Sequence, residues 1–224
     1  MGSALCFIVS GPSGSGKTTV VEHLLGRIPN LLFSVSYTTR APRGGEQNRR
    51  EYFFVQPQEF EQMIARDELL EYARVFGQYY GTHGRVLEQA TREGKDLLLD
   101  IDVQGARQVK ARLPAAVAVF VLPPSRQELE RRLRARGLDA PDVIQRRLER
   151  AREEIESHET YDYLVVNRDL SSTCAQVEAI LLTERAARRG QPPPPEAEAH
   201  AAAARREATK SQVSAILESF GAHG

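Results

Sequence analysis

The chain has 224 residues, of which 27% are charged and 41% hydrophobic, and its thirty basic side chains balance its thirty acidic ones. This length suits one α/β domain with small insertions. The zero net charge argues against a chain-wide electrostatic partner such as nucleic acid or an anionic membrane surface.

Membrane, export and redox signals are also missing from the sequence. No apolar run reaches the roughly 18 residues of a membrane span, and the short run near the start does not have the form of a signal peptide. The two cysteines, Cys6 and Cys174, have neither metal nor disulfide spacing, and the five histidines form no ligand pattern. We therefore expect a cytoplasmic protein that does not contact membranes.

A phosphate-binding loop follows the first apolar run. Residues 4–9 predict a strand buried on both faces, residues 11–18 fit G-x-x-x-x-G-K-[ST], and apolar residues then recur at helical spacing. Glycines let the backbone curl so that its N–H groups point at phosphate oxygens, and the following helix adds its positive end. We expect Lys17 to reach the β- and γ-phosphates and the Thr18 hydroxyl to bind Mg²⁺. The predicted triphosphate site comprises Gly11, Pro12, Ser13, Gly14, Ser15, Gly16, Lys17, Thr18 and Thr19.

Short elements of alternating type are expected next. They are strands at residues 31–36, 51–55 and 69–76, helices at 57–67 and 85–93, and turns at 37–46 and 78–82. Residues 37–84 therefore predict a compact α+β insertion.

The second half of the chain alternates buried strands with helices. Strands are expected at residues 96–101, 115–122 and 163–166, and helices at 103–113, 125–136, 142–157 and 171–189. Ser125 and Glu128 form a capping-box pattern at one helix start. Asp100 and Asp102 stand at the carboxyl end of a strand, where open parallel sheets bind ligands. The fold class is therefore α/β with a parallel sheet.

The composition changes after Gly190. A run of four prolines predicts a stiff spacer, and residues 196–220 have high helix propensity. Val213, Ile216, Leu217 and Phe220 form an apolar stripe at helical spacing. We divide the chain into a domain at residues 1–190 and an extension at 191–224. The stripe suggests self-association through this helix; the alternative, which we favour, is a mobile appendage whose removal leaves activity largely intact.

Six further segments occur in a characteristic order: SVSYTTRAPRGGE, EYFFV, LLEYARVFGQYYGT, LLLDIDVQGA, LERRLRARGLDAPDVIQRRLERA and YDYLVVN. With the phosphate-binding loop, they resemble bacterial guanylate kinase over residues 4–189. The resemblance implies an ATP:GMP phosphotransferase that forms GDP in purine nucleotide metabolism, with Mg²⁺ and ATP as cofactor and co-substrate. It also implies a P-loop kinase core, a GMP-binding insertion at about residues 37–84 and a helical lid at about residues 130–150.

The resemblance also assigns roles residue by residue. The positions that match those around the GMP phosphate are Arg40, Arg43, Tyr52 and Tyr80. The positions that match those near the guanine base are Ser36, Glu71 and Thr82. The positions that match lid and core arginines around the transferred phosphate, with Lys17 as the other catalytic cation, are Arg132, Arg136 and Arg147. Asp100 matches an acidic residue at the junction of nucleotide and Mg²⁺, and Asn167 matches the segment beside the adenine of ATP.

Elementary chemistry agrees with these roles. Arginine holds a phosphate with two parallel hydrogen bonds, which lysine does less well. Guanine presents two adjacent N–H donors, which the single carboxylate of Glu71 can accept together, while Ser36 can serve the guanine oxygen. Two other functions fit parts of the pattern: a binding module that docks phosphopeptides in the GMP site, and a kinase for a phosphorylated sugar. The first typically lacks the phosphate-binding loop, and the second lacks the GMP-site residues.

Overall fold

Five strands of the chain form one parallel sheet, as the alternation of strands and helices predicts. The computed structural model describes residues 4–135, 137 and 139–221. The sheet order is β2-β7-β1-β8-β9, and every neighbouring pair is parallel. The strands are β1 (Cys6–Ser10), β2 (Leu31–Phe33), β7 (Asp96–Asp100), β8 (Val117–Leu122) and β9 (Tyr163–Val166).

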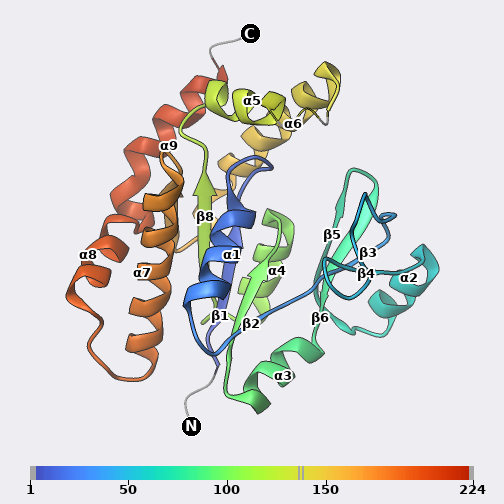
Figure 1. Ribbon diagram of the computed structural model, residues 1–224, viewed down its shortest axis with the longest axis horizontal. Coiled ribbons are helices and arrows are strands. Elements are labelled where there is room, and N and C mark those ends of the chain that lie inside the picture. Colours follow the sequence, from blue (N-terminus) through green and yellow to red (C-terminus); the bar gives the residue numbers. More distant parts are fainter. Residues whose placement is uncertain (1–3, 136, 138, 222–224) are drawn as a thin grey trace.

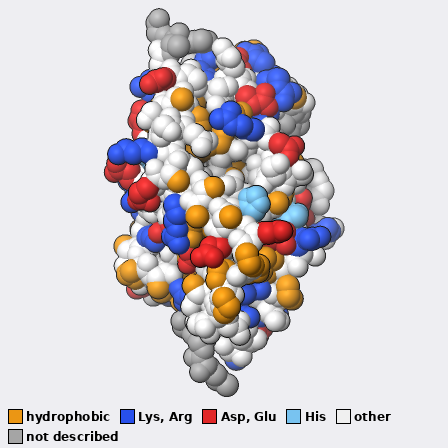
Figure 2. Space-filling view, turned by 90° about the vertical axis from the view of Figure 1, so that its left-hand side faces the viewer, with side chains coloured by type: hydrophobic (Ala, Val, Ile, Leu, Met, Phe, Trp, Pro, Cys, Tyr) orange, Lys and Arg blue, Asp and Glu red, His pale blue; other side chains and the backbone are white. Residues whose placement is uncertain are grey.

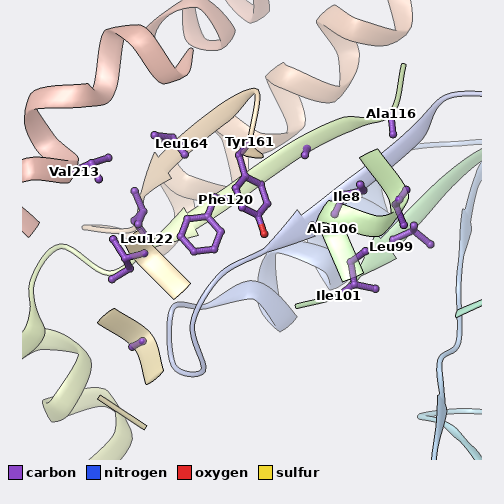
Figure 3. Packing of buried hydrophobic residues seen from close by; sticks show 14 of the residues in the cluster. Ile8, Leu99, Ile101, Ala106, Ala116, Phe120, Leu122, Tyr161, Leu164 and Val213 are labelled. Carbon is purple, nitrogen blue, oxygen red and sulfur yellow. The ribbon is translucent and has the colours of Figure 1, made fainter. Parts of the chain in front are cut away.

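Helices cover both faces of this sheet, so its strands alternate their side chains between two apolar layers. One layer lies beneath α1 (Lys17–Arg27), α7 (Leu170–Arg188) and α8 (Pro195–Ala203). The other lies beneath α3 (Arg85–Glu93), α4 (Val103–Arg112), α5 (Arg126–Ala135), α6 (Pro141–Glu156) and α9 (Arg206–Gly221). In this second layer Phe120 packs on Tyr161, which follows the short 3₁₀ helix His158–Thr160, with ring centroids 4.6 Å apart (Figure 3).

The expected α+β insertion is present beside the core (Figure 1). Its sheet has the order β4-β3-β6-β5. Its elements are β3 (Tyr37–Thr38), β4 (Phe53–Phe54), α2 (Pro57–Ala65), β5 (Leu69–Val75) and β6 (Gln78–His83). A small apolar layer of its own holds α2 against the sheet, with Phe60 stacked on Tyr79 at 5.1 Å.

Three of the sequence expectations for residues 31–82 are wrong. Residues 78–82 form strand β6 and not a turn, because the reversal lies one step earlier, at Phe76 and Gly77. Both residues have positive φ, 49° and 81°, as the two-residue turn of a hairpin requires. The strand expected at residues 31–36 ends at Phe33, and part of the expected turn at 37–46 is strand β3 of the second sheet.

The C-terminal extension packs on the body of the chain, so the prediction that it is a mobile appendage is wrong. Its apolar stripe lies in the layer under α9: Val213, Ile216 and Phe220 are buried among side chains of the core, and Leu217 is partly buried against them. Figure 3 shows Val213 beside Leu164 of β9. Since the stripe faces the chain's own core, it no longer supports self-association through this helix.

The extension also covers the edge of the parallel sheet. Strand β9 is an outer strand, and outer strands present unpaired backbone groups to solvent. Here Leu164 N donates to Ala204 O at 2.8 Å, and Arg206 N donates to Asp162 O at 3.2 Å. The Arg205 guanidinium stacks over the Tyr163 ring at 4.3 Å. Residues 191–221 therefore complete both an apolar layer and a sheet edge.

One face of the molecule mixes charged and hydrophobic side chains. Figure 2 shows the face that carries α7 and α8, on which charges of both signs are interspersed and hydrophobic side chains lie in small groups. Within the described residues, no helix is long and apolar enough to cross a membrane.

These contacts predict that the extension stabilises the domain. Ile216→Ala in the full chain should lower the free energy of unfolding by about 2–5 kcal/mol, the usual cost of emptying a buried isoleucine site. Truncation after Gly190 should cost more, because it removes three large buried side chains and the partners of β9. Thermal unfolding followed by circular dichroism measures both effects.

The control is Gln212→Ala, on the exposed face of α9, which should change stability by less than about 0.5 kcal/mol. A truncated chain as stable as the full one would show that the extension is dispensable.

Candidate functional site

One cavity of about 350 Å³ lies where the carboxyl ends of β1 and β7 meet the insertion. Its walls come from the loop after β1, from the insertion strands, from the end of β7 and from α6. The predicted site residues that line it are Gly11, Ser13, Gly14, Gly16, Lys17, Thr18, Ser36, Arg43, Tyr52, Glu71, Tyr80, Asp100 and Arg147. The topology therefore brings both predicted nucleotide sites into a single space.

The loop after β1 has the curled backbone that a phosphate site needs. Gly11, Gly14 and Gly16 all have positive φ, from 93° to 148°. A Cβ at Gly16 would overlap the amide of Asn167, and one at Gly11 would overlap the carbonyl of Val121. The loop closes on itself through Ser15 N, which donates to Pro12 O at 3.1 Å. Only glycine fits these two positions, since both the conformation and the neighbours forbid a side chain.

Lys17 folds back over this loop. Its ammonium donates to the carbonyl of Gly11 and, at 3.3 Å, to that of Pro12. Thr18, at the start of α1, is exposed on the cavity wall. Both side chains therefore line the cavity beside the loop.

Two residues predicted to touch ATP or the transferred phosphate lie behind the loop, outside the cavity wall. Asn167 is buried and donates from Nδ2 to Ser15 O at 2.7 Å, so it supports the loop from below. Arg132 on α5 donates to Asn167 O at 2.9 Å and pairs with Glu128 at 2.8 Å. Pro12, Ser15 and Thr19 are also absent from the cavity lining. The Ser125–Glu128 capping box is half formed, because Ser125 Oγ accepts from Glu128 N while the Glu128 carboxylate turns to its arginines.

The lid arginines differ in their placement. Arg147 on α6 lines the cavity, donates to Ser13 Oγ at 3.0 Å and pairs with Asp139 at 3.1 Å. Its Nε is buried and has no hydrogen-bond partner within the described part of the chain. Arg136 lies outside the described residues.

The predicted phosphate grip forms a cluster on the insertion. The Arg40 guanidinium is held by Glu46 through two contacts of 2.9 Å and lies over the Tyr52 ring at 5.3 Å. Tyr52 in turn meets Tyr80 edge-on at 5.9 Å. Arg43, Tyr52 and Tyr80 line the cavity, whereas Arg40 is one layer behind them. Glu46, which orients Arg40, was not singled out from the sequence, although its position six residues after an arginine in a turn-rich loop was visible.

The predicted base-reading residues meet at Glu71. Its side chain is buried, with 3% of the residue exposed, and burial raises the pKa of Glu71 to about 7. The polar neighbour Thr82 opposes this rise in pKa, and the nearby Asp102 adds to it. Ser36 lies on the same cavity wall, and Thr82 pairs with Glu71 across the β5–β6 ladder. This carboxyl group thus sits between its neutral and charged forms near neutral pH.

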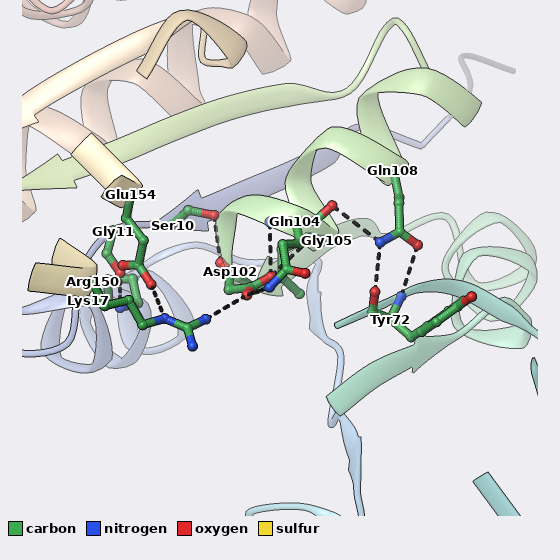
Figure 4. A network of polar contacts seen from close by, with 11 residues as sticks. Ser10, Gly11, Lys17, Tyr72, Asp102, Gln104, Gly105, Gln108, Arg150 and Glu154 are labelled. Carbon is green, nitrogen blue, oxygen red and sulfur yellow. Dashed lines mark hydrogen bonds and ion pairs between the residues drawn. The ribbon is translucent and has the colours of Figure 1, made fainter. Parts of the chain in front are cut away.

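Two charged cavity residues, Arg150 and Glu154, were missed in the sequence. Arg150 on α6 pairs with Glu154 at 2.8 Å and Asp102 at 3.3 Å (Figure 4), and it lies 5.0 Å from the ring of Phe76 at the hairpin tip. Burial raises the pKa of Glu154, and Arg150 opposes this. The signal was present, since Arg147, Arg150 and Glu154 recur at spacings of three and four on one helix face.

Two cavity residues, Thr18 and Asp100, fit a Mg²⁺ ion that a bound triphosphate would also hold. Burial raises the pKa of Asp100, and the charge of Lys17 lowers it. Within the described residues, no group of three or more potential ligands forms a closed metal site. Mg²⁺ is usually held by one or two protein oxygens together with phosphates and water. Thr18 and Asp100, both on the cavity wall, supply that number of oxygens.

Comparisons with known proteins agree with this geometry. The family model described as guanylate kinase matches residues 3–184. The guanylate kinase of Koribacter versatilis is 50% identical over an alignment that covers 97% of this chain and 96% of that protein. That of Methylococcus capsulatus is 49% identical and covers 83% of this chain and 91% of its own length.

A solved structure extends the match to three dimensions. The crystal structure of guanylate kinase from Anaplasma phagocytophilum has a TM-score of 0.67 at 34% identity, covering 82% of this chain and 87% of that one. The family model stops before the C-terminal extension, which the Koribacter alignment nearly spans. On these sequence and structural matches, the chain belongs to the guanylate kinase family.

Proposed function

We propose that this chain transfers the γ-phosphoryl group of ATP to GMP and forms ADP and GDP. The observation that carries the proposal is the single cavity, in which a buried carboxyl group suited to guanine lies across from a phosphate-binding loop. A sugar acceptor would have no use for a buried carboxyl group of this kind. A binding module would have no use for a lysine and glycines arranged to hold a triphosphate.

The reaction needs positioning and charge neutralisation more than covalent chemistry. A GMP phosphate oxygen attacks the γ-phosphorus of ATP, and the bond from that phosphorus to the oxygen bridging to the β-phosphate breaks, leaving ADP. The loop amides and Lys17 hold the β- and γ-phosphates of ATP. Arg43, Tyr52 and Tyr80 hold the acceptor phosphate, with Arg40 behind them. Mg²⁺, held at Thr18 and at Asp100, would neutralise phosphate charge when bound with ATP.

Glu71 and Arg147 complete the arrangement. The ionised Glu71 carboxylate accepts from N1–H and the 2-amino group of guanine, and Ser36 serves O6. Arg147 lies beside Ser13 of the loop, where it can follow the charge on the transferred phosphoryl group. Arg132, which lies behind the loop and holds Asn167, acts through the shape of the loop.

The protein would act in the cytoplasm, in purine nucleotide metabolism. Both cysteines are buried and free, as is usual in a reducing compartment.

A coupled assay of ADP release tests the proposal with GMP, IMP, AMP and phosphorylated sugars as acceptors. GMP should be the best substrate, with GDP identified as the product. Turnover with a phosphorylated sugar and not with GMP would assign another kinase, and binding of ATP and GMP without turnover would assign a binding module.

Lys17→Ala should lower kcat by about 10²–10³-fold or more, because the γ-phosphate loses its main protein cation. The fold should survive, since the ammonium contacts only loop carbonyls. Lys210→Ala, an exposed lysine of α9, is the control. Near-normal turnover in Lys17→Ala, with the control unchanged, would contradict the proposed site.

Arg147→Ala should lower kcat by about a hundredfold while changing the KM for ATP and for GMP by less than about threefold, because its charge acts mainly in the transition state. The matched control is Arg146→Ala, whose partner Asp142 is equally exposed at the surface. A change confined to KM would assign Arg147 to ground-state binding.

Glu71→Gln should weaken the binding of GMP and narrow the preference for GMP over AMP, because an amide both donates and accepts hydrogen bonds. The wild-type protein should follow the order GMP, then IMP, with AMP about 10⁴-fold behind, since AMP leaves the carboxylate unpaired. Measured kcat/KM values for the three acceptors in both proteins decide. An unchanged ratio of GMP to AMP would show that another residue reads the base.

The pKa of about 7 adds a pH dependence to this comparison. Only the ionised carboxylate accepts both guanine N–H groups, so KM for GMP should rise as the pH falls below 7, by up to about tenfold for each pH unit. Glu71→Gln should lose this dependence. The GMP phosphate titrates near pH 6 in both proteins, so the difference between them isolates Glu71.

A further inference from the structure

One edge of strand β5 has no neighbouring strand, and a side chain of α4 forms hydrogen bonds with it instead. In the insertion sheet β5 is an outer strand, and its other side packs against α4. Gln108 donates from Nε2 to Tyr72 O at 2.6 Å and accepts from Tyr72 N on Oε1 at 3.2 Å. Figure 4 shows this amide lying along the strand with both bonds formed. The side chain therefore satisfies the same two backbone groups that a neighbouring strand would satisfy.

The residue so held is the one after Glu71, at an irregular point of the strand. The β5–β6 register shifts between Leu69 and Glu71, so that Glu71 lies opposite Thr82. Such bulges commonly redirect a side chain next to an active site. Here Glu71 turns into the cavity while Tyr72 turns outward, with 37% of it exposed. A bulged strand keeps less of its own ladder, so its direction depends more on the support at its other edge.

The same face of α4 also fixes the carboxyl group itself. Gly105 lies in the first turn of α4, three residues before Gln108 and on the same side of the helix. A Cβ on Gly105 would overlap Glu71 Oε2 and lie 2.9 Å from Glu71 Cδ. The Glu71 carboxyl group thus rests on the bare backbone of α4, and any residue other than glycine at position 105 would leave no room for it.

From these contacts we infer that Gly105 and Gln108 of α4 form a positioning surface for Glu71, which sets the affinity and selectivity for the acceptor base. The inference rests on the proposed function of Glu71 as the group that reads guanine. Gln108 holds the strand and Gly105 leaves space for the carboxyl group. Neither lines the cavity, so both act through Glu71 and not on the substrate.

Gln108→Met tests the first contact, because it keeps the length of the side chain and removes both hydrogen bonds to Tyr72, together with a longer one of 3.3 Å to Gln104 O. Two bonds of this kind correspond to about a tenfold effect. KM for GMP should rise by about that factor, the preference for GMP over IMP should narrow, and kcat and KM for ATP should change by less than about twofold. Gln108→Asn, whose amide is one methylene too short to pair with Tyr72, is the second variant if the methionine protein folds poorly.

Gly105→Ala tests the second contact. Alanine favours the helix, so the fold should hold, but the new methyl must displace the Glu71 carboxyl group. The same rise in KM for GMP at unchanged KM for ATP is expected. Gln89→Met is the matched control, because Gln89 is a helical glutamine of α3 that pairs only with the exposed Glu93. It should leave both KM values unchanged.

The pH profile separates positioning from general loosening. A Glu71 carboxyl group released toward water and away from Asp102 should have a lower pKa, so the rise in KM for GMP at acid pH should move to lower pH in Gln108→Met. Equal rises in KM for ATP and GMP, or an unchanged GMP preference and pH profile, would overturn the inference. A wild-type protein that does not phosphorylate GMP would instead overturn the proposed function, so the two failures are distinguishable.

Discussion

The burial of one carboxyl group, that of Glu71, is the constraint on which the arrangement of the predicted GMP site depends. Removing a carboxylate from water is costly unless partners replace the water. In the free protein the replacement is incomplete, and the pKa is raised from 4.5 to about 7. In such a case the folded state binds the proton more tightly than the unfolded chain, so stability falls as the pH rises from about 4.5 to about 7. The shift corresponds to roughly 3 kcal/mol, a sizeable fraction of the stability of a typical domain.

In the proposed function, guanine would offset this cost. Its two N–H donors would replace the water that the carboxylate has lost. A ligand that offers a lone pair instead leaves the charge both buried and unpaired. In the proposed function, selectivity for guanine would therefore come from the cost of burying the Glu71 carboxylate. The same logic requires the carboxyl group to stay where water cannot reach it, and this depends on the insertion being held firmly against the core at α4.

The sequence predicted the parts whose physics is local. The loop at residues 11–18 has its conformation encoded by glycines, and the five core strands are encoded by runs of apolar residues, so the loop conformation and the alternation of strands and helices are confirmed. The hairpin turn was predicted at residues 78–82 but lies at Phe76 and Gly77, because the positive φ of Phe76 is not visible from its residue type. Arg132 and Asn167 were assigned to the ligand side, although their hydrogen bonds hold them behind the loop. Arg150, Glu154 and Gln108 escaped notice because their importance depends on which helix lies against which strand.

The C-terminal extension is a whole segment whose placement could not be predicted from the sequence alone. From sequence, an apolar stripe beyond a proline run is consistent with a free helix, a dimer contact or a docked helix, since all three need the same spacing. What decides among them is the unfilled surface left by the preceding residues. Without the extension, one edge of strand β9 would be unpaired, and Leu164 would lack the apolar contacts that α9 supplies. In the structure α9 also touches the base of α5, where Ser219 Oγ accepts from Arg126 N at 3.0 Å. The helix that carries Arg132, and through it the support of the phosphate loop, thus begins against the extension. A segment that the family model does not cover is thereby joined, through packing and a hydrogen bond, to the helix that supports the phosphate-binding loop.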